Sequence, residues 1–158
     1  MGKYDTASGA AISPSFITGL NGPIGLAVKG NTLFEADSAS GTVGEYDATT
    51  GATINANFIA GLDFPIRLAL RGNTLFVADS ASGTVGEYDA TTGAAISPSF
   101  ITDPNRPVAL AVLGNTLFVA NVNSGTVGEY DATTGATISP SFITGLIGPA
   151  GIAGKSAK

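Results

Sequence analysis

The chain has 158 residues, of which 12% are charged, and 12 acidic against 7 basic residues give a net charge of −5. Nucleic acids and anionic membranes bind clusters of Lys and Arg, so the net negative charge disfavours both as partners. The sequence contains no Cys and no His, which removes disulfides, Cys/His zinc sites and any nucleophile activated by an imidazole. No stretch approaches the ~20 apolar residues of a spanning helix, so membrane insertion is not expected.

A unit of 42 residues is repeated along the whole chain. Tyr-Asp pairs begin at Tyr4, Tyr46, Tyr88 and Tyr130, and the run Gly-Asn-Thr-Leu-Phe returns with the same step. No insertion breaks the register, so every unit is expected to adopt the same backbone. A period of this length is typical of four-stranded propeller blades and of two-helix repeats, and local chemistry has to separate the two.

Local signals in the unit spanning residues 24–65 favour strands. An apolar segment ends at Gly30-Asn31, which is a two-residue hairpin signal, and the segment that follows is rich in Thr and Phe. Glycines recur too closely for helices of about 10 residues or more. We therefore predict the strands Ile24–Lys29, Thr32–Asp37, Thr42–Asp47 and Thr53–Ile59. An α-solenoid is the less favoured alternative.

Proline positions agree with this order of strands. Pro14, Pro98 and Pro140 lie in the predicted fourth strand, and the first three predicted strands contain none. Proline lacks the N–H that a sheet ladder needs, so it is confined to edge strands, where it also hinders aggregation. The predicted fold class is therefore an all-β β-propeller of four-stranded antiparallel blades, in a partial or about four-bladed array, with the fourth strand outermost.

The repeat divides residues 1–158, taken as one array, unevenly. Residues 1–23 carry the third and fourth strands of a split blade, residues 24–65, 66–107 and 108–149 form full blades, and residues 150–158 begin a further blade with Ala150–Gly154 as its first strand. Propellers typically have 4 to 8 blades. Three alternatives follow: a fragment of a longer array, a homodimer whose two arcs complete a ring, or a monomeric four-bladed or open arc.

The segment GLAVKGNTLFEADSASGTVGEYDATTG, which begins at Gly25, resembles the blade of NHL-type β-propellers. Those blades run Gly-hydrophobic-Ala-Val, then Leu-Phe/Tyr-Val-Ala-Asp, then a strand that ends in an aromatic residue and Asp. The near-identical Thr-, Ser- and Gly-rich units are similar to repeats of exported bacterial PEP-CTERM-associated proteins. This resemblance implies an extracellular or cell-surface location, although the sequence shows neither an export signal nor an anchor segment.

Few positions differ between the units, and they lie in the loops before the first strand, on the first strand, on the second strand and in the turn after it. In a propeller these two loops share one face around the central channel, where ligands usually bind. The candidate ligand-binding residues are Glu35, Asp63, Arg67, Asn105, Arg106, Asn121 and Asn123. Drift in exposed loops is the alternative explanation.

The recurring acidic residues are assigned to structure. Glu45, Asp47 and their equivalents are expected to serve solvation and turn formation, because equivalent residues in successive blades lie too far apart to form a carboxylate pair. The turn Asp37-Ser-Ala-Ser-Gly offers one carboxylate and lacks the bidentate Glu of a calcium loop. No metal and no other cofactor is predicted.

Two hypotheses for function follow. The first is a non-catalytic binding or scaffold propeller, exported, whose loop-rich face contacts a protein or a glycan, since a repeated surface suits multivalent contact. The second is a metal-dependent hydrolase similar to propeller lactonases. That site needs several oxygen ligands that converge on the channel, whereas the predicted first strands carry no carboxylate.

Overall fold

A computed structural model describes residues 1–102 and 105–153. Its strands form three four-stranded antiparallel sheets and one two-stranded sheet, and each larger sheet is a meander in which consecutive strands pair. The first sheet comprises β3 (Pro23–Lys29), β4 (Thr32–Asp37), β5 (Thr42–Asp47) and β6 (Thr53–Ala60). We call it blade 1.

Blades 2 and 3 repeat this plan. Blade 2 contains β7 (Pro65–Arg71), β8 (Thr74–Asp79), β9 (Thr84–Asp89) and β10 (Ala95–Thr102), and blade 3 contains β11 (Pro107–Leu113), β12 (Thr116–Asn121), β13 (Thr126–Asp131) and β14 (Thr137–Ile143). The short strands β1 (Lys3–Tyr4) and β2 (Ala11–Ser13) pair with each other at the N-terminal end.

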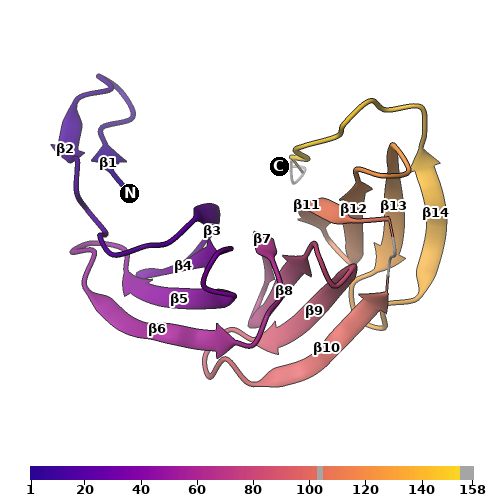
Figure 1. Cartoon of the computed structure of the whole chain (residues 1–158), viewed down its shortest axis with the longest axis horizontal. Helices are drawn as coiled ribbons and strands as arrows, with labels where there is room; N and C mark the ends of the chain where they lie inside the picture. Colours follow the sequence, from indigo (N-terminus) through magenta and orange to yellow (C-terminus); the bar gives the residue numbers. More distant parts are fainter. Residues whose placement is uncertain (103–104, 154–158) are drawn as a thin grey trace.

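The blades stand side by side along an open arc (Figure 1). The first strands β3, β7 and β11 line its inner side, and the fourth strands β6, β10 and β14 form its outer rim. Strand β7 contacts both β3 and β11, so successive blades meet along their inner strands. This radial arrangement of four-stranded sheets is that of a β-propeller, and it confirms the predicted fold class.

The predicted strands of the first unit agree with the structure within one residue at each end. Two details of the proline argument were wrong. Each inner strand begins with a proline, at Pro23, Pro65 and Pro107, which a sheet tolerates because the first residue of a strand need not donate to the ladder. Pro14 follows β2 instead of lying within it, while Pro98 and Pro140 do lie in edge strands as predicted.

The C-terminal segment requires a further correction. Residues 150–153 were expected to be a strand but form none among the described residues, because an inner strand pairs only with the second strand of its own blade, as β11 does with β12. Gly154 and the rest of the predicted segment, up to residue 158, lie outside the described residues.

Turn chemistry explains why the strands end where they do. Gly30, Gly72 and Gly114 begin the two-residue hairpins with positive φ, and at Gly30 the angle is 58°, which suits a type II′ turn. After the third strand, Asp47 Oδ1 accepts hydrogen bonds from the backbone N–H of Thr49 and Thr50, at 2.9 and 2.7 Å. The recurring aspartates therefore form turns, as the sequence predicted.

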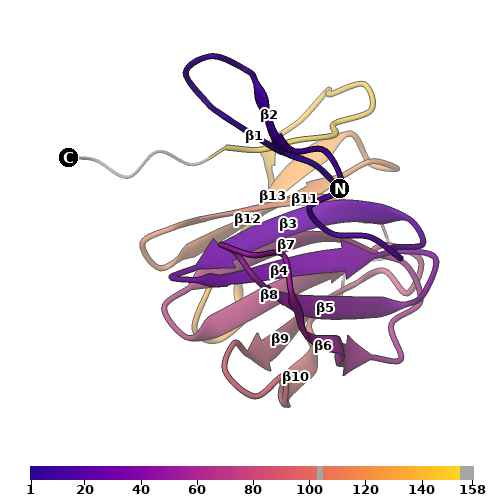
Figure 2. The same cartoon turned by 90° about the vertical axis from the view of Figure 1, so that its left-hand side faces the viewer.

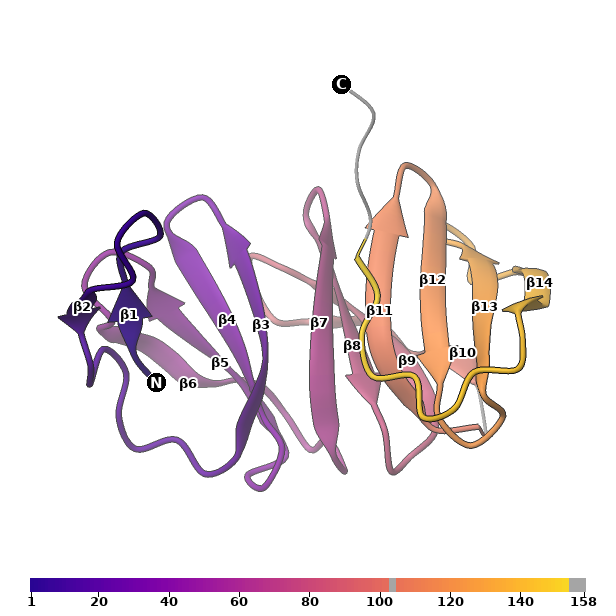
Figure 3. The same ribbon diagram turned by 90° about the horizontal axis from the view of Figure 1, so that it is seen from above.

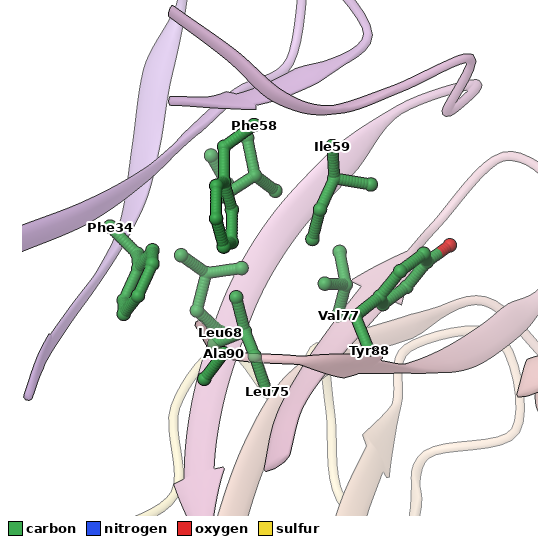
Figure 4. Close-up of a cluster of buried hydrophobic side chains, with 10 residues drawn as sticks. Phe34, Phe58, Ile59, Leu68, Leu75, Val77, Tyr88 and Ala90 are labelled. Atoms are coloured by element: carbon green, nitrogen blue, oxygen red, sulfur yellow. The ribbon is translucent and has the colours of Figure 1, made fainter. Parts of the chain in front are cut away.

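The hydrophobic core lies between blades. Phe34 of blade 1 and Leu75 of blade 2 are completely buried in one cluster, which Phe58, Ile59 and Tyr88 help to form (Figure 4). An equivalent cluster joins blade 2 to blade 3. Each blade therefore has one face that packs on the preceding blade and one that packs on the following blade, and a blade at the end of the arc has one of them without a neighbouring blade.

Candidate functional site

The inter-blade loops and the turns after the second strands lie at the same end of the blades (Figure 3). Asp79, which ends β8, accepts hydrogen bonds from the backbone N–H of Asp63 at 2.9 Å and of Phe64 at 2.7 Å. Asp37 holds the loop before β3 in the same way, through the N–H of Asn21. We call this end, made of residues 19–22, 38–41, 61–64, 80–83, 105–106 and 122–125, the loop face.

Three of the predicted site residues come together between blades 2 and 3. The backbone N–H of Asn123 donates to the carbonyl of Asn105 at 3.1 Å, and the N–H of Val122 donates to the carbonyl of Arg106 at 3.1 Å. The side chains of Asn105, Arg106 and Asn123 are exposed on the loop face. Asp63 is exposed on the same face, in the preceding inter-blade loop.

Arg106 has a backbone conformation that only glycines share in the described part of the chain. Its φ is 64°, in the left-handed region, which costs a residue with a β-carbon about 1–2 kcal/mol. Gly22 and Gly148 stand one repeat unit or two from this position and also have positive φ. Strained residues persist only where the surrounding structure compensates for the strain, and they cluster at functional sites. Arg106 is therefore a functional candidate.

Asn121 ends β12 and pairs with Pro107, the residue that follows Arg106. It is 1% exposed, and its Oδ1 atom has no hydrogen-bond partner. In the other two blades an aspartate, Asp37 or Asp79, stands at this position and accepts backbone N–H groups of the inter-blade loop. Asn121 thus replaces a charged acceptor with a neutral amide where the loop sequence also changes.

Arg67 lies near the start of the inner strand β7 and not in an inter-blade loop. Its Nη1 donates to its own neighbour's carbonyl, at Ile66, and its Nη2 donates to the carbonyl of Ala150 at 3.4 Å. The side chain therefore holds the C-terminal segment against the inner side of the arc. This contact joins residues 83 positions apart, and no local sequence signal indicates it.

Glu35 does not lie at the mouth where the sequence placed it. The side chain is completely buried on the face of blade 1 that turns toward the N-terminal segment, and both carboxylate oxygens lack hydrogen-bond partners. Equivalent positions in blades 2 and 3 are Val77 and Val119, which pack between blades. Burial, assisted by the nearby Asp37 carboxylate, raises the pKa of Glu35 to about 7, against an opposing effect of the N-terminal ammonium group.

The opposite end of the blades carries contacts that the sequence did not predict. Lys29, at the end of β3, donates to the Asn73 side chain of blade 2. Arg71, at the end of β7, reaches the Asn115 side chain and the Thr133 hydroxyl of blade 3. The sequence does carry a signal for these contacts. It is a cation at the end of an inner strand, followed one repeat later by a Gly-Asn hairpin.

The part of the chain that the structure describes contains no cluster of side chains that could bind a metal ion. Within residues 1–102 and 105–153, no three of Asp, Glu, His and Cys lie close enough to hold one ion. The same residues include no helix that is long and apolar enough to cross a membrane.

A hollow of about 290 Å³ borders Asn105, between β10 and β14, and Thr102 and Tyr130 also line it.

Comparison with known proteins supports the fold and does not identify a family. No protein-family profile and no curated protein matches the sequence. Among solved structures, hydrazine synthase of Kuenenia stuttgartiensis has a TM-score of 0.73 at 22% identity, over 94% of this chain and 42% of that one. The WD40 repeats of RRP9 have a TM-score of 0.69 at 12% identity, over 81% of this chain and 41% of that one.

The computationally designed protein Ika8 is similar over 98% of this chain and 46% of its own, with a TM-score of 0.70 at 19% identity. The chain therefore spans less than half the length of these three structures. The fold and the neighbours together define the class as a β-propeller-type repeat protein.

Proposed function

We propose that this chain is a non-catalytic binding scaffold, of the NHL type, that uses its loop face to contact a protein or a glycan. The observation that carries the proposal is the contrast between the two ends of the blades. The end opposite the loop face repeats the same asparagine-to-aspartate and threonine hydrogen bonds in every blade, as at Asn31, Asn73 and Asn115. On the loop face, by contrast, the residues differ from blade to blade.

The loop face offers both charge and apolar surface. Asp63 and Arg106 are exposed on it, and so is Phe64, which is 38% exposed in the loop between blades 1 and 2. Aromatic residues and arginine are the types that most often dominate binding energy at protein interfaces. A loop held on a rigid sheet scaffold is also the usual place for recognition residues.

A location outside the cell or at its surface forms part of the proposal. Its support is the resemblance of the blades to exported bacterial PEP-CTERM-associated repeats. Fractionation of the source cells tests it, because recovery of the protein only from the cytosol would contradict the proposed location.

Binding can be tested with labelled protein on an array of glycans and on a panel of purified cell-surface proteins. We expect Arg106→Ala and Asn123→Ala to weaken the strongest interaction about tenfold or more, because exposed arginines at an interface centre often contribute over 1 kcal/mol. Asn57→Ala is the matched control, since Asn57 is an exposed asparagine on the outer strand β6. Equal losses in all three variants, or none, would contradict the proposal.

A further inference from the structure

The two ends of the arc expose apolar side chains whose equivalents inside the arc are buried or partly buried. At the C-terminal end, Phe142 is 53% exposed, whereas its equivalent Phe58 is 7% exposed under blade 2. At the N-terminal end, Leu26 is 50% exposed, whereas its equivalent Leu68 is 7% exposed against blade 1. The sequence is apolar at both positions, so the difference comes from the missing neighbour.

Other exposed apolar residues behave differently. Ile54, Ile96 and Ile138 occupy one repeat position on the outer strands, and each is 56–57% exposed. Their exposure is the same in every blade, so it belongs to the outer rim and not to the ends. Among the described residues, the end faces combine large exposed apolar side chains with positions that are buried inside the arc, which is how an unfilled interface differs from ordinary surface.

At the C-terminal end this surface forms a hollow of about 400 Å³, lined by residues that include Leu113, Phe118, Phe142, Ile143 and Leu146. The C-terminal segment fills one side of it. Ile152 packs against the buried cluster of Ala109, Ala120 and Val127, as Leu68 packs in the cluster that contains Ala36 and Val43. The segment thus occupies the place of the first strand of a next blade, although it has no strand beside it to pair with.

The N-terminal end supplies the complementary part. In the repeat register, β1 and β2 are a third and a fourth strand, and they stand at the opposite end of the arc (Figures 1 and 2). Tyr4, on β1, is 57% exposed, whereas Tyr46, Tyr88 and Tyr130 are 5–6% exposed. In the interior, Tyr88 packs in the same cluster as Ile59, and the residue equivalent to Ile59 at the free C-terminal end is Ile143.

We propose that these two faces bind each other between two copies of this chain, so that two arcs close a ring head to tail. A second copy is the occupant because each chain carries both halves of an interface that it already forms twice inside itself, between blades 1 and 2 and between blades 2 and 3. The first-strand place taken by Ile152 in one copy and the hairpin β1–β2 of the other belong to one composite blade. No described residue takes the second-strand place in that blade.

The side chains at the junction agree with this occupant. Lys29 and Arg71 end their inner strands and reach hairpin asparagines of the next blade, but Leu113 stands at this position in blade 3. The hairpin β1–β2 has no asparagine of this kind that could accept a hydrogen bond from a cation. Leu113 needs no such acceptor, so the junction leaves no cation without a partner.

Size-exclusion chromatography with light scattering tests the proposal on the unmodified chain. We expect a mass twice that of the 15.6 kDa chain. Ile143→Asp and Val28→Asp each block one face and should give monomers, whereas Ile54→Asp, the matched control on the outer rim, should stay dimeric. A monomer for the unmodified chain, a mass above the dimer, or equal effects of all three variants would overturn the proposal.

Mixing the two blocked variants separates a head-to-tail junction from a symmetric one. One variant keeps its N-terminal face and the other keeps its C-terminal face, so the mixture should regain dimers through one intact junction, while each variant alone stays monomeric. Dimers of either variant alone would show like-with-like contact and would overturn the head-to-tail arrangement.

Cross-linking tests the same junction without placing a charge in either apolar face. The chain has no cysteine, so Tyr4→Cys with Ile143→Cys allows a short bismaleimide to join two copies. We expect the cross-linked dimer to predominate, at least tenfold above the pair Tyr4→Cys with Ile54→Cys. Equal yields from both pairs would overturn the proposal.

Discussion

The ring of Tyr46 lies over Gly44 in β5: a β-carbon at Gly44 would come within 2.6 Å of the Tyr46 Cε2 atom. The same arrangement recurs at Gly86 and Tyr88. Glycine at this position therefore lets the tyrosine fold back along its own strand and fill the space between blades. The Gly-Glu-Tyr-Asp signature of the repeat is thus a packing unit.

Gly44→Ala is expected to destabilise the chain by about 1–3 kcal/mol, because the added methyl group overpacks a buried site. Chemical unfolding in urea measures the change. Gly151→Ala is the control, since no atom lies within 4 Å of a β-carbon there. In a Tyr46→Ala background the cost of Gly44→Ala should fall by more than half; an undiminished cost would contradict the packing explanation.

Glu35→Val should stabilise the chain at pH 8. The carboxyl pKa rises from 4.5 unfolded to about 7 folded, so the folded state binds the extra proton between these values and stability falls as pH rises from 4.5 to 7. The shift corresponds to roughly 3 kcal/mol at most. Urea midpoints at pH 5 and pH 8 should differ in the parent chain and differ less in Glu35→Val, whereas an unchanged pH dependence would contradict this assignment.

Asp89→Ala should destabilise the chain, because Asp89 accepts hydrogen bonds from Thr91, Thr92 and the Asn73 side chain. The same bonds, led by that from the Thr91 backbone, hold the pKa of Asp89 below its usual 3.8. Its stabilising effect is therefore present above pH 3.8 and lost as pH falls below it. Thermal unfolding at pH 3 and pH 6 checks both parts, and Asp89→Ala should matter less at the lower pH.

Arg71→Leu copies the residue that stands at Leu113 in blade 3. We expect a loss of about 0.5–1.5 kcal/mol, because the arginine joins blade 2 to the Asn115 side chain and to the Ala132 carbonyl of blade 3. Arg71→Lys, which retains the charge but lacks the planar guanidinium group, should lose less stability. If urea unfolding gave the same midpoint for all three proteins, the contact between blades would contribute nothing to stability.

The sequence by itself determined the period, the four strands of each unit and the turns between them. These follow from local chemistry: Gly30 begins a hairpin, Asp47 holds a turn, and Pro98 and Pro140 lie on edge strands. Their physical causes act within a few residues, so they can be read from one repeat without knowing the others.

Only the tertiary structure decided what happens between repeats. It buried Glu35, drew Arg67 to Ala150, and left Phe142 exposed where Phe58 is covered. Each of these depends on a neighbour one or two repeat units away in the chain, and a pattern repeated along the sequence is the same whether or not a neighbour is present. Burial and exposure at the ends of the arc are therefore properties of the array, and no single repeat unit contains them.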